Sequence, residues 1–272
     1  MNASPLLIPR IIHRIWLGSE PLPDEFGEYG DSWRRQHPDW EMRLWTDDDL
    51  PEVSDVETLA RARTPAERAD VVRLELLRRF GGVYTDTDVE CQRSLEPLIA
   101  GVSAFACFSR PGHVGTAVIG SVPGHPALER AVREVSGRVG EGHIGDVAGP
   151  KYFTRLVADF PDIVVFDQAT FYPFRSSEPY LRGKKYPDAY TIHHWSATWK
   201  SREAYAEQVE KLRGKLERQR QRTKRAEAQR AKAERRLAGI QASRWWRLRG
   251  GLARLAGPAR PLLSSARARL RR

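Results

Sequence analysis

Two aspartates two positions apart, Asp86 and Asp88, are the residues of this chain best suited to bind a metal ion. They end a short β-prone run, and at the end of a strand the chain can bend so that both carboxylates reach one cation. Mg²⁺ and Mn²⁺ prefer such oxygen ligands and often share them with the phosphates of a substrate. Charged sequences also contain this tripeptide by chance, so a pair of solvated aspartates on a turn is the alternative interpretation.

A histidine-rich segment near the end of the acidic part of the chain offers further metal ligands. His193 and His194 follow a short β-prone run. Neutral imidazole is a common metal ligand and suits Mn²⁺ beside two carboxylates. A histidine pair packed in the core is the alternative.

The element that must position the two aspartates is a helix predicted over residues 64–80, with a tight turn and a short strand after it. Thr64 is a suitable N-cap, and Glu67 is placed to complete a capping box. Gly81 is the residue type expected just past the last helical turn. Gly82 then allows a sharp turn into the β-prone run that ends in the aspartates.

The spacing A-D-x-x-R, followed by G-G-x-Y-x-D-x-D, resembles glycosyltransferases with a DXD sugar-binding region, of the capsular polysaccharide and Golgi α-1,6-mannosyltransferase type. The matching residues are Arg68, Ala69, Asp70, Arg73, Gly81, Gly82, Tyr84, Asp86 and Asp88. The resemblance implies that Asp86 and Asp88 hold a divalent metal on the diphosphate of a nucleotide sugar. It also implies that Asp70 and Arg73 bind the donor sugar and that Tyr84 belongs to the donor site. Taken alone, Asp70 and Arg73 would be an ordinary surface ion pair.

Two other segments match the same family. The start, I-P-R-I-I-H-R-I-W-L-G, places Trp16 where a tryptophan stacks on the nucleotide base in remote toxin relatives, with a buried core tryptophan as the alternative. The closing His-x-Trp-x-x-Ser-Trp segment implies His193 as a metal ligand, with His194 as the second choice. It also implies that Thr198, which replaces the usual serine but keeps a hydroxyl, and Trp199 cap the phosphate.

Alternating predicted strands and helices indicate an α/β fold with the metal at the carboxyl end of a strand. The resemblance sharpens this to a GT-A type, Rossmann-like nucleotide-sugar-binding domain, followed by a helical, basic C-terminal extension. Residues 1–199, the predicted catalytic domain, carry 22 Lys and Arg against 29 Asp and Glu, whereas residues 200–272 carry 23 against 6. This change of charge marks the domain boundary.

The basic extension contains two predicted parts. Residues 200–240 repeat apolar positions at alternating spacings of four and three, a heptad pattern that is polar in its middle. We predict a coiled coil and a homo-oligomer, with a lone solvated helix as the alternative. In the tail, residues 241–272, tryptophan and leucines share a helical face among arginines, which is typical of binding to an anionic membrane surface. A disordered tail is the alternative, and no nucleic acid is expected because no recognised module accompanies the charge.

The cysteines and the apolar segments of the sequence indicate where in the cell the protein is located. Cys91 and Cys107 have no ligand-like spacing, so buried free thiols are expected rather than a zinc site, with a disulfide between the two as the alternative. The start of the chain lacks the pattern of a signal peptide, and no apolar run approaches the ~20 residues that span a bilayer. These features predict a cytoplasmic protein, with its tail at the inner face of the cell membrane.

Together with these features, the resemblance implies a hexosyltransferase that depends on Mn²⁺ or Mg²⁺. It would move a hexose from a UDP- or GDP-sugar to a glycan, lipid-linked or protein acceptor, with retention of configuration, in surface polysaccharide synthesis. Two alternatives stay open. The segment from Asp86 also resembles the nucleophile motif of aspartyl-phosphate phosphohydrolases. Otherwise the chain is a non-catalytic coiled-coil scaffold whose body binds a nucleotide or a glycan.

Overall fold

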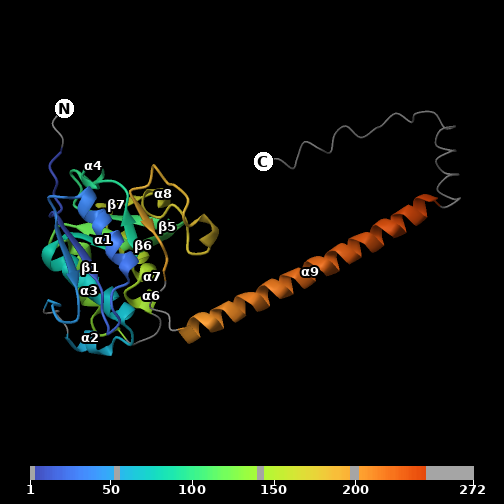
Figure 1. Cartoon of the computed structure of the whole chain (residues 1–272), viewed down its shortest axis with the longest axis horizontal. Helices are drawn as coiled ribbons and strands as arrows, with labels where there is room; N and C mark the ends of the chain where they lie inside the picture. Colours follow the sequence, from blue (N-terminus) through green and yellow to red (C-terminus); the bar gives the residue numbers. More distant parts are fainter. Residues whose placement is uncertain (1–3, 52–55, 140–143, 197–201, 243–272) are drawn as a thin grey trace. The chain divides into compact units, whose positions relative to one another are not determined.

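A computed structural model describes residues 4–51, 56–139, 144–196 and 202–242 (Figure 1). The chain divides into two compact units, Met1–Trp199 and Lys200–Arg272. The first unit is a mixed α/β domain and the second contains a long helix, which confirms the predicted fold class.

A six-stranded sheet with the order β2-β1-β3-β6-β5-β7 forms the centre of the first unit. Its strands are β1 (Ile11–Ile15), β2 (Glu41–Trp45), β3 (Gly82–Thr85), β5 (Ala104–Arg110), β6 (His113–Ser121) and β7 (Ile163–Phe166). Only β6 is antiparallel to its neighbours in this sheet, and the other five strands point the same way. The chain first moves from β1 to β2 and then returns to place β3 on the other side of β1. The strand order therefore reverses at the junction of β1 and β3.

Two hydrophobic clusters, one on each face, hold helices against this sheet. The first cluster includes residues of α3 (Pro65–Phe80), α5 (Pro126–Val135) and α7 (Pro150–Ala158). The second includes residues of α1 (Asp24–Gln36), α4 (Glu96–Ile99) and α8 (Gln168–Phe171). Three short helical elements complete the described part of this unit: α2 (Val56–Arg61), α6 (Ile144–Val147) and η1 (Pro179–Leu181). The sheet is thus the middle layer of three.

A separate sheet of two short strands lies beside the first. Strands β4 (Val89–Cys91) and β8 (Thr191–His193) pair antiparallel, with Val89 opposite His193. Because β4 follows the DXD tripeptide directly, this pairing places the histidine-rich segment next to the two aspartates.

The helix, turn and strand predicted around the DXD motif are confirmed, with one change at the helix start. The Thr64 side chain accepts a hydrogen bond of 3.1 Å from the Glu67 N–H, as an N-cap should. The Glu67 carboxylate, however, binds the backbone N–H of Arg63 at 2.7 Å instead of closing the box on Thr64, because it also pairs with the Arg63 guanidinium. After the helix, Gly81 and Gly82 have φ angles of 62° and 88°, which favour glycine.

The second unit contains α9 (Arg202–Ala242), one uninterrupted helix (Figure 1). Three apolar residues of the predicted heptad seam, Leu216, Leu237 and Ile240, are 51%, 55% and 49% exposed. The coiled coil and the homo-oligomer stay predictions, and residues 243–272 of the predicted tail lie outside the described residues. Within the described ranges, no helix has both the length and the apolar character that crossing a bilayer requires.

Both cysteines are buried free thiols, as predicted. Burial raises the pKa of Cys91 and of Cys107 to about 12, so both stay protonated at neutral pH. They act as small apolar side chains of the core.

Candidate metal centre

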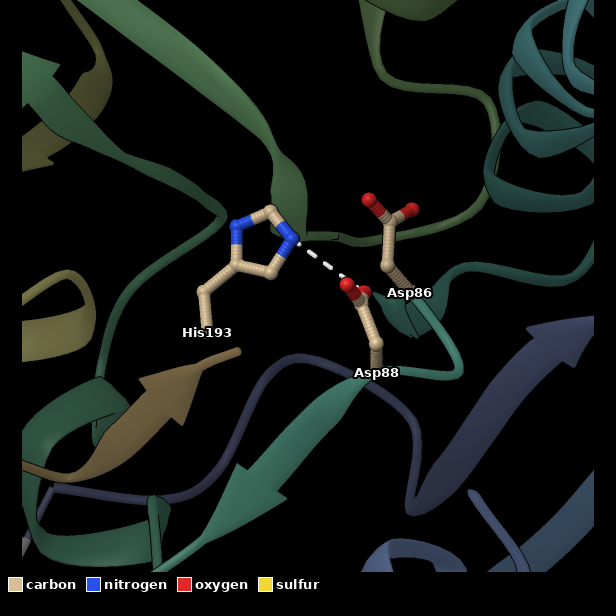
Figure 2. Close-up of side chains that lie close together, drawn as sticks. All are labelled: Asp86, Asp88 and His193. Carbon is tan, nitrogen blue, oxygen red and sulfur yellow. Dashed lines mark ion pairs between the residues drawn. The ribbon is translucent and has the colours of Figure 1, made fainter. Parts of the chain in front are cut away.

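Asp86, Asp88 and His193 form a group whose ligand atoms all lie within 4.8 Å of one another. Figure 2 shows the three side chains turned toward a common point, with both aspartates on the turn after β3 and the histidine on β8. The Nε2 atom of His193 is 3.1 Å from Oδ1 of Asp88. The structure thus brings together the three residues that the sequence predicted as metal ligands.

Asp86 is held by buried groups of the main sheet and of α3. The Tyr84 hydroxyl donates a 2.6 Å hydrogen bond to Oδ1 of Asp86, and Nη1 of Arg73 lies 3.5 Å from the same oxygen. Arg73 also pairs with Asp70, one helical turn earlier, and donates to the Thr116 carbonyl at 2.6 Å. A chain of contacts therefore runs from Asp70 through Arg73 to the metal group.

Arg73 is the buried, positively charged residue beside Asp86. Burial alone would lower the pKa of its guanidinium, but the negative charge of Asp70, with smaller effects of Tyr84 and Asp86, outweighs burial and raises it. The guanidinium carbon lies 4.6 Å from the centre of the Tyr84 ring. Burial raises the pKa of Asp70, an effect that Arg73 partly offsets. Arg73 therefore fixes both Asp86 and the tyrosine that binds it.

Asp88 is held by the segment that follows β8. The Ser196 N–H donates to Oδ2 of Asp88 at 2.8 Å, and the His194 N–H donates to the Asp88 carbonyl at 3.0 Å. Burial would raise the pKa of the Asp88 carboxyl, but the charge and hydrogen bond of His193 and the Ser196 N–H outweigh it and lower the pKa. Asp88 is therefore ionised at neutral pH.

Trp195 turns the backbone between His194 and Ser196, a feature that the sequence did not predict. Its φ of 54° lies in the left-handed region, which is uncommon for a residue other than glycine. The indole N–H donates to the Phe174 carbonyl at 3.1 Å, and the ring centre lies 3.9 Å from that of His193. The turn presents the Ser196 N–H to Asp88, and the indole packs on the His193 ring.

His194, the second choice as a metal ligand, points elsewhere. Its Nε2 atom lies 3.1 Å from Oε2 of Glu90. Its ring stacks on Tyr29, with the ring centres 4.2 Å apart and the planes 5° from parallel. Of the two histidines, only His193 faces the aspartates.

The remaining predicted donor-site residues fall in two places. Trp16 follows β1 directly and is half-buried; its indole N–H donates to the Glu20 carbonyl at 2.7 Å. Since β1 and β3 are adjacent and parallel, Trp16 and Asp86 lie at the same edge of the sheet. Thr198 and Trp199 lie outside the described residues.

The donor set fits a divalent cation. Two carboxylates and one imidazole suit Mn²⁺, and the carboxylates also suit Mg²⁺. The buried Nδ1 atom of His193 has no hydrogen-bond partner within the described part of the chain. Nε2 is the ring atom that faces Asp88, so the imidazole presents that nitrogen to the shared point.

Comparison with known proteins finds similarity to glycosyltransferases. Residues 23–104 match the family described as "Glycosyltransferase sugar-binding region containing DXD motif". The chain is 37% identical over 137 residues to mannosyl phosphorylinositol ceramide synthase SUR1 of Saccharomyces cerevisiae, covering 48% of this chain and 35% of the relative. It is 36% identical over 134 residues to inositol phosphoceramide mannosyltransferase 3 of Schizosaccharomyces pombe, covering 47% and 37%. The match therefore spans only about a third of the length of these relatives.

A solved structure with a similar chain path is that of the PaToxG glycosyltransferase. The TM-score is 0.48 at 16% identity, covering 58% of this chain and 72% of the other. The family match includes α3, β3 and both aspartates of the metal group. Residues 23–104 of this chain are therefore similar to the sugar-binding region of glycosyltransferases with a DXD motif.

Proposed function

We propose that this chain is a divalent-metal-dependent hexosyltransferase that uses a nucleotide-diphosphate sugar. The observation that carries the proposal is the convergence of Asp86, Asp88 and His193 at the carboxyl end of β3, within and beside the DXD region. In open α/β sheets, ligands bind outside the carboxyl ends of the strands where the strand order reverses. That point in this sheet is the junction of β1 and β3, at which the metal group and Trp16 lie.

The roles of the donor-site residues follow from their positions. Asp86, Asp88 and His193 would hold Mn²⁺ or Mg²⁺, which would neutralise the charge that develops on the leaving diphosphate. We assign the donor sugar to Asp70 and Arg73, which contact the metal group through Asp86.

Three further assignments complete the donor site. Trp16 is assigned to the nucleotide base because it lies at the same sheet edge as the metal group. Thr198 and Trp199 are assigned to the phosphates on the family resemblance. Tyr84 acts through Asp86, to which its hydroxyl is bonded.

We further propose that the hexose is transferred with retention of configuration. In that reaction the acceptor hydroxyl attacks from the face that the diphosphate leaves, and the diphosphate takes the proton of the acceptor. Determination of the anomeric configuration of a purified product tests this step, and an inverted product would exclude it.

The acceptor that we propose is a phosphate-bearing, lipid-linked glycan. The two yeast relatives are named for mannose transfer to inositol phosphoceramide, which makes a mannose donor the first to test. In the acidic body, Arg182, Lys184 and Lys185 form an exposed basic group after η1. Arg182 donates to the carbonyl of His194, next to the metal group, so these charges can meet an acceptor phosphate near the site. A surface polysaccharide acceptor is the alternative.

The donor is best identified by thermal shift with GDP-mannose, UDP-glucose and UDP-galactose, each with and without Mn²⁺. A donor that binds the folded state raises the melting temperature by mass action, and we expect this rise only when Mn²⁺ is present. The control is the double variant Asp86→Ala/Asp88→Ala, which should lose the metal-dependent rise. Transfer by that variant in chelator-treated buffer would refute the proposal.

The two rival functions give different results in the same assays. A phosphohydrolase would cleave a generic phosphate ester and ignore nucleotide sugars. Its nucleophile would be Asp86, whose Oδ1 is already bound by Tyr84 and paired with Arg73, and this disfavours attack on phosphorus. A non-catalytic scaffold could bind a nucleotide sugar, but it would neither hydrolyse the donor nor transfer its sugar.

For the C-terminal unit we propose self-association through α9 and binding of residues 241–272 to the anionic inner face of the cell membrane. Half-exposed apolar residues at seam positions support the first proposal. Sedimentation of the full chain tests it, and a monomer at all concentrations would contradict it. Deletion of residues 241–272 should abolish binding to anionic liposomes and leave donor hydrolysis intact.

A further inference from the structure

Strand β1 carries a charged residue, Arg14, at a position of the core. Successive side chains of a strand face opposite sides of the sheet. Ile15 belongs to the hydrophobic cluster on the α3 side, while Ile12, two residues before Arg14, belongs to the cluster on the α1 side. Arg14 is only 3% exposed. Burial of a charge is costly unless hydrogen bonds compensate it, so the contacts of this side chain indicate its role.

The Arg14 guanidinium joins helix α1 to the DXD tripeptide. Its Nη2 atom donates to the Phe26 carbonyl of α1 at 2.6 Å and to the Thr87 carbonyl at 2.8 Å. Both partners are neutral carbonyls, and the Nε atom has no partner within the described residues. Burial lowers the pKa of Arg14 to about 10, so the group stays charged at neutral pH. The two bonds fix the distance between α1 and the middle of the tripeptide.

A glycine in α1 makes room for this guanidinium. A Cβ atom added to Gly30 would lie 2.1 Å from Nη1 of Arg14, a distance that no real contact allows. Gly27 lies one turn earlier on the same helix, and a Cβ atom there would meet nothing within 4 Å. The two glycines therefore differ in one respect that an experiment can use: only Gly30 faces Arg14.

Each residue of the DXD tripeptide is bound by side chains or backbone groups from a different part of the fold. Asp86 is held from α3 and β3, and Asp88 is held from the segment after β8. The Thr87 carbonyl between them is held by Arg14. We propose that Arg14, seated against Gly30, is the positioning residue of the DXD turn and sets how the two carboxylates converge. The inference rests on the proposed function only for the identity of the bound ion.

Four variants of the full chain test this inference. Arg14→Met removes both donated bonds and should weaken Mn²⁺ binding by about 10- to 100-fold, as loss of an outer partner of metal ligands does. Arg14→Lys keeps the charge but not the planar fork and should recover part of the loss. Gly30→Ala should displace Arg14 and reproduce the effect of Arg14→Met. Gly27→Ala is the matched control and should bind Mn²⁺ as the wild type does.

A double variant separates positioning from general damage to the fold. If Gly30→Ala acts through Arg14, adding it to Arg14→Met should weaken Mn²⁺ binding no further. Hydrogen exchange over residues 86–89, measured without metal, should quicken in Arg14→Met and not in Gly27→Ala. The exchange measurement tests the positioning role of Arg14 even if the wild type binds no Mn²⁺. Failure of the wild type to bind Mn²⁺ would contradict the proposed function but not the positioning role. The inference is overturned if folded Arg14→Met shows wild-type exchange in this turn, or if the two substitutions add.

Discussion

Asp86 and Asp88 lie two residues apart but are held by different parts of the molecule. Asp86 is bound by Tyr84 and Arg73, which are buried in the main sheet and in the helix before it. Asp88 is bound by His193 and Ser196, more than 100 residues further along the chain, through a pair of three-residue strands. We expect the first set of contacts to support folding and the second to support metal binding with little effect on the fold.

The largest effect should come from Arg73→Met, on the Asp86 side. Removal of one partner of a buried ion pair leaves the charge of Asp70 buried and uncompensated, beside Asp86. We expect the free energy of unfolding to fall by about 3–5 kcal/mol. Urea denaturation measures the change. Arg133→Met, at an exposed position on α5, is the control and should stay within about 0.5 kcal/mol of the wild type.

Acid should destabilise the Asp86 side through a second buried group, His13. Its Nδ1 atom accepts from the Trp45 indole N–H at 3.1 Å, so Nε2 carries the proton that binds the Gly81 carbonyl at 2.9 Å. Burial lowers the pKa of His13 from 6.5 to about 4; the Gly81 bond opposes this, Arg43 adds to it and Glu41 opposes it. A second ring proton would also face the indole donor.

The unfolded chain therefore binds a proton that the folded chain excludes between pH 6.5 and 4. The stabilising contribution of neutral His13 is complete above pH 6.5 and should be lost as the pH falls to 4, by about 3 kcal/mol in all. Unfolding by urea across this range measures it. The variant His13→Gln does not titrate, and an equal pH slope in this variant would contradict the assignment.

On the Asp88 side, His193→Gln removes a proposed metal ligand. It should weaken Mn²⁺ binding by at least about 100-fold, because loss of a mere outer partner of a ligand already costs about 10- to 100-fold. His194→Gln is the matched control, because His194 faces Glu90 and stacks on Tyr29. Its Mn²⁺ affinity should stay close to that of the wild type. Isothermal titration measures both. Equal losses of Mn²⁺ affinity in the two variants would contradict the assignment of His193, and not His194, as the metal ligand.

The smallest expected effect concerns one backbone N–H. Ser196→Pro removes the donor to Asp88, and proline also disfavours the turned backbone of Trp195, which acts in the same direction. We expect about tenfold weaker Mn²⁺ binding, with a melting temperature near that of the wild type. Ser196→Ala keeps the N–H and should bind normally. A large fall in melting temperature for Ser196→Pro would place this contact among the folding contacts instead.

The Asp86 side could be predicted from the sequence because its signals are local. A cap at Thr64, glycines at 81 and 82 and a β-prone run define the helix, turn and strand within one short stretch. In each case the residue types at the ends of the element determine where it begins or stops.

The Asp88 side could not be predicted from the residues alone. The pairing of β4 with β8 involves three residues of each strand and leaves no periodic pattern. Reasoning from residue types left His193 and His194 open, and the family resemblance favoured His193. Their separation depends on ring orientations that only tertiary contacts determine. The left-handed turn at Trp195 has no local signal, whereas Arg14 does have one: a charged residue within a run of isoleucines.

The order of strands along the chain has a consequence for synthesis on the ribosome. All six strands of the main sheet have been made once Phe166 is in place, while His193 comes later, on β8. Since domains can fold as they are made, a nascent chain can form its sheet and both acidic ligands before the imidazole exists. Under the proposed function, the three ligands that would hold the ion are therefore complete only after β8 has been translated.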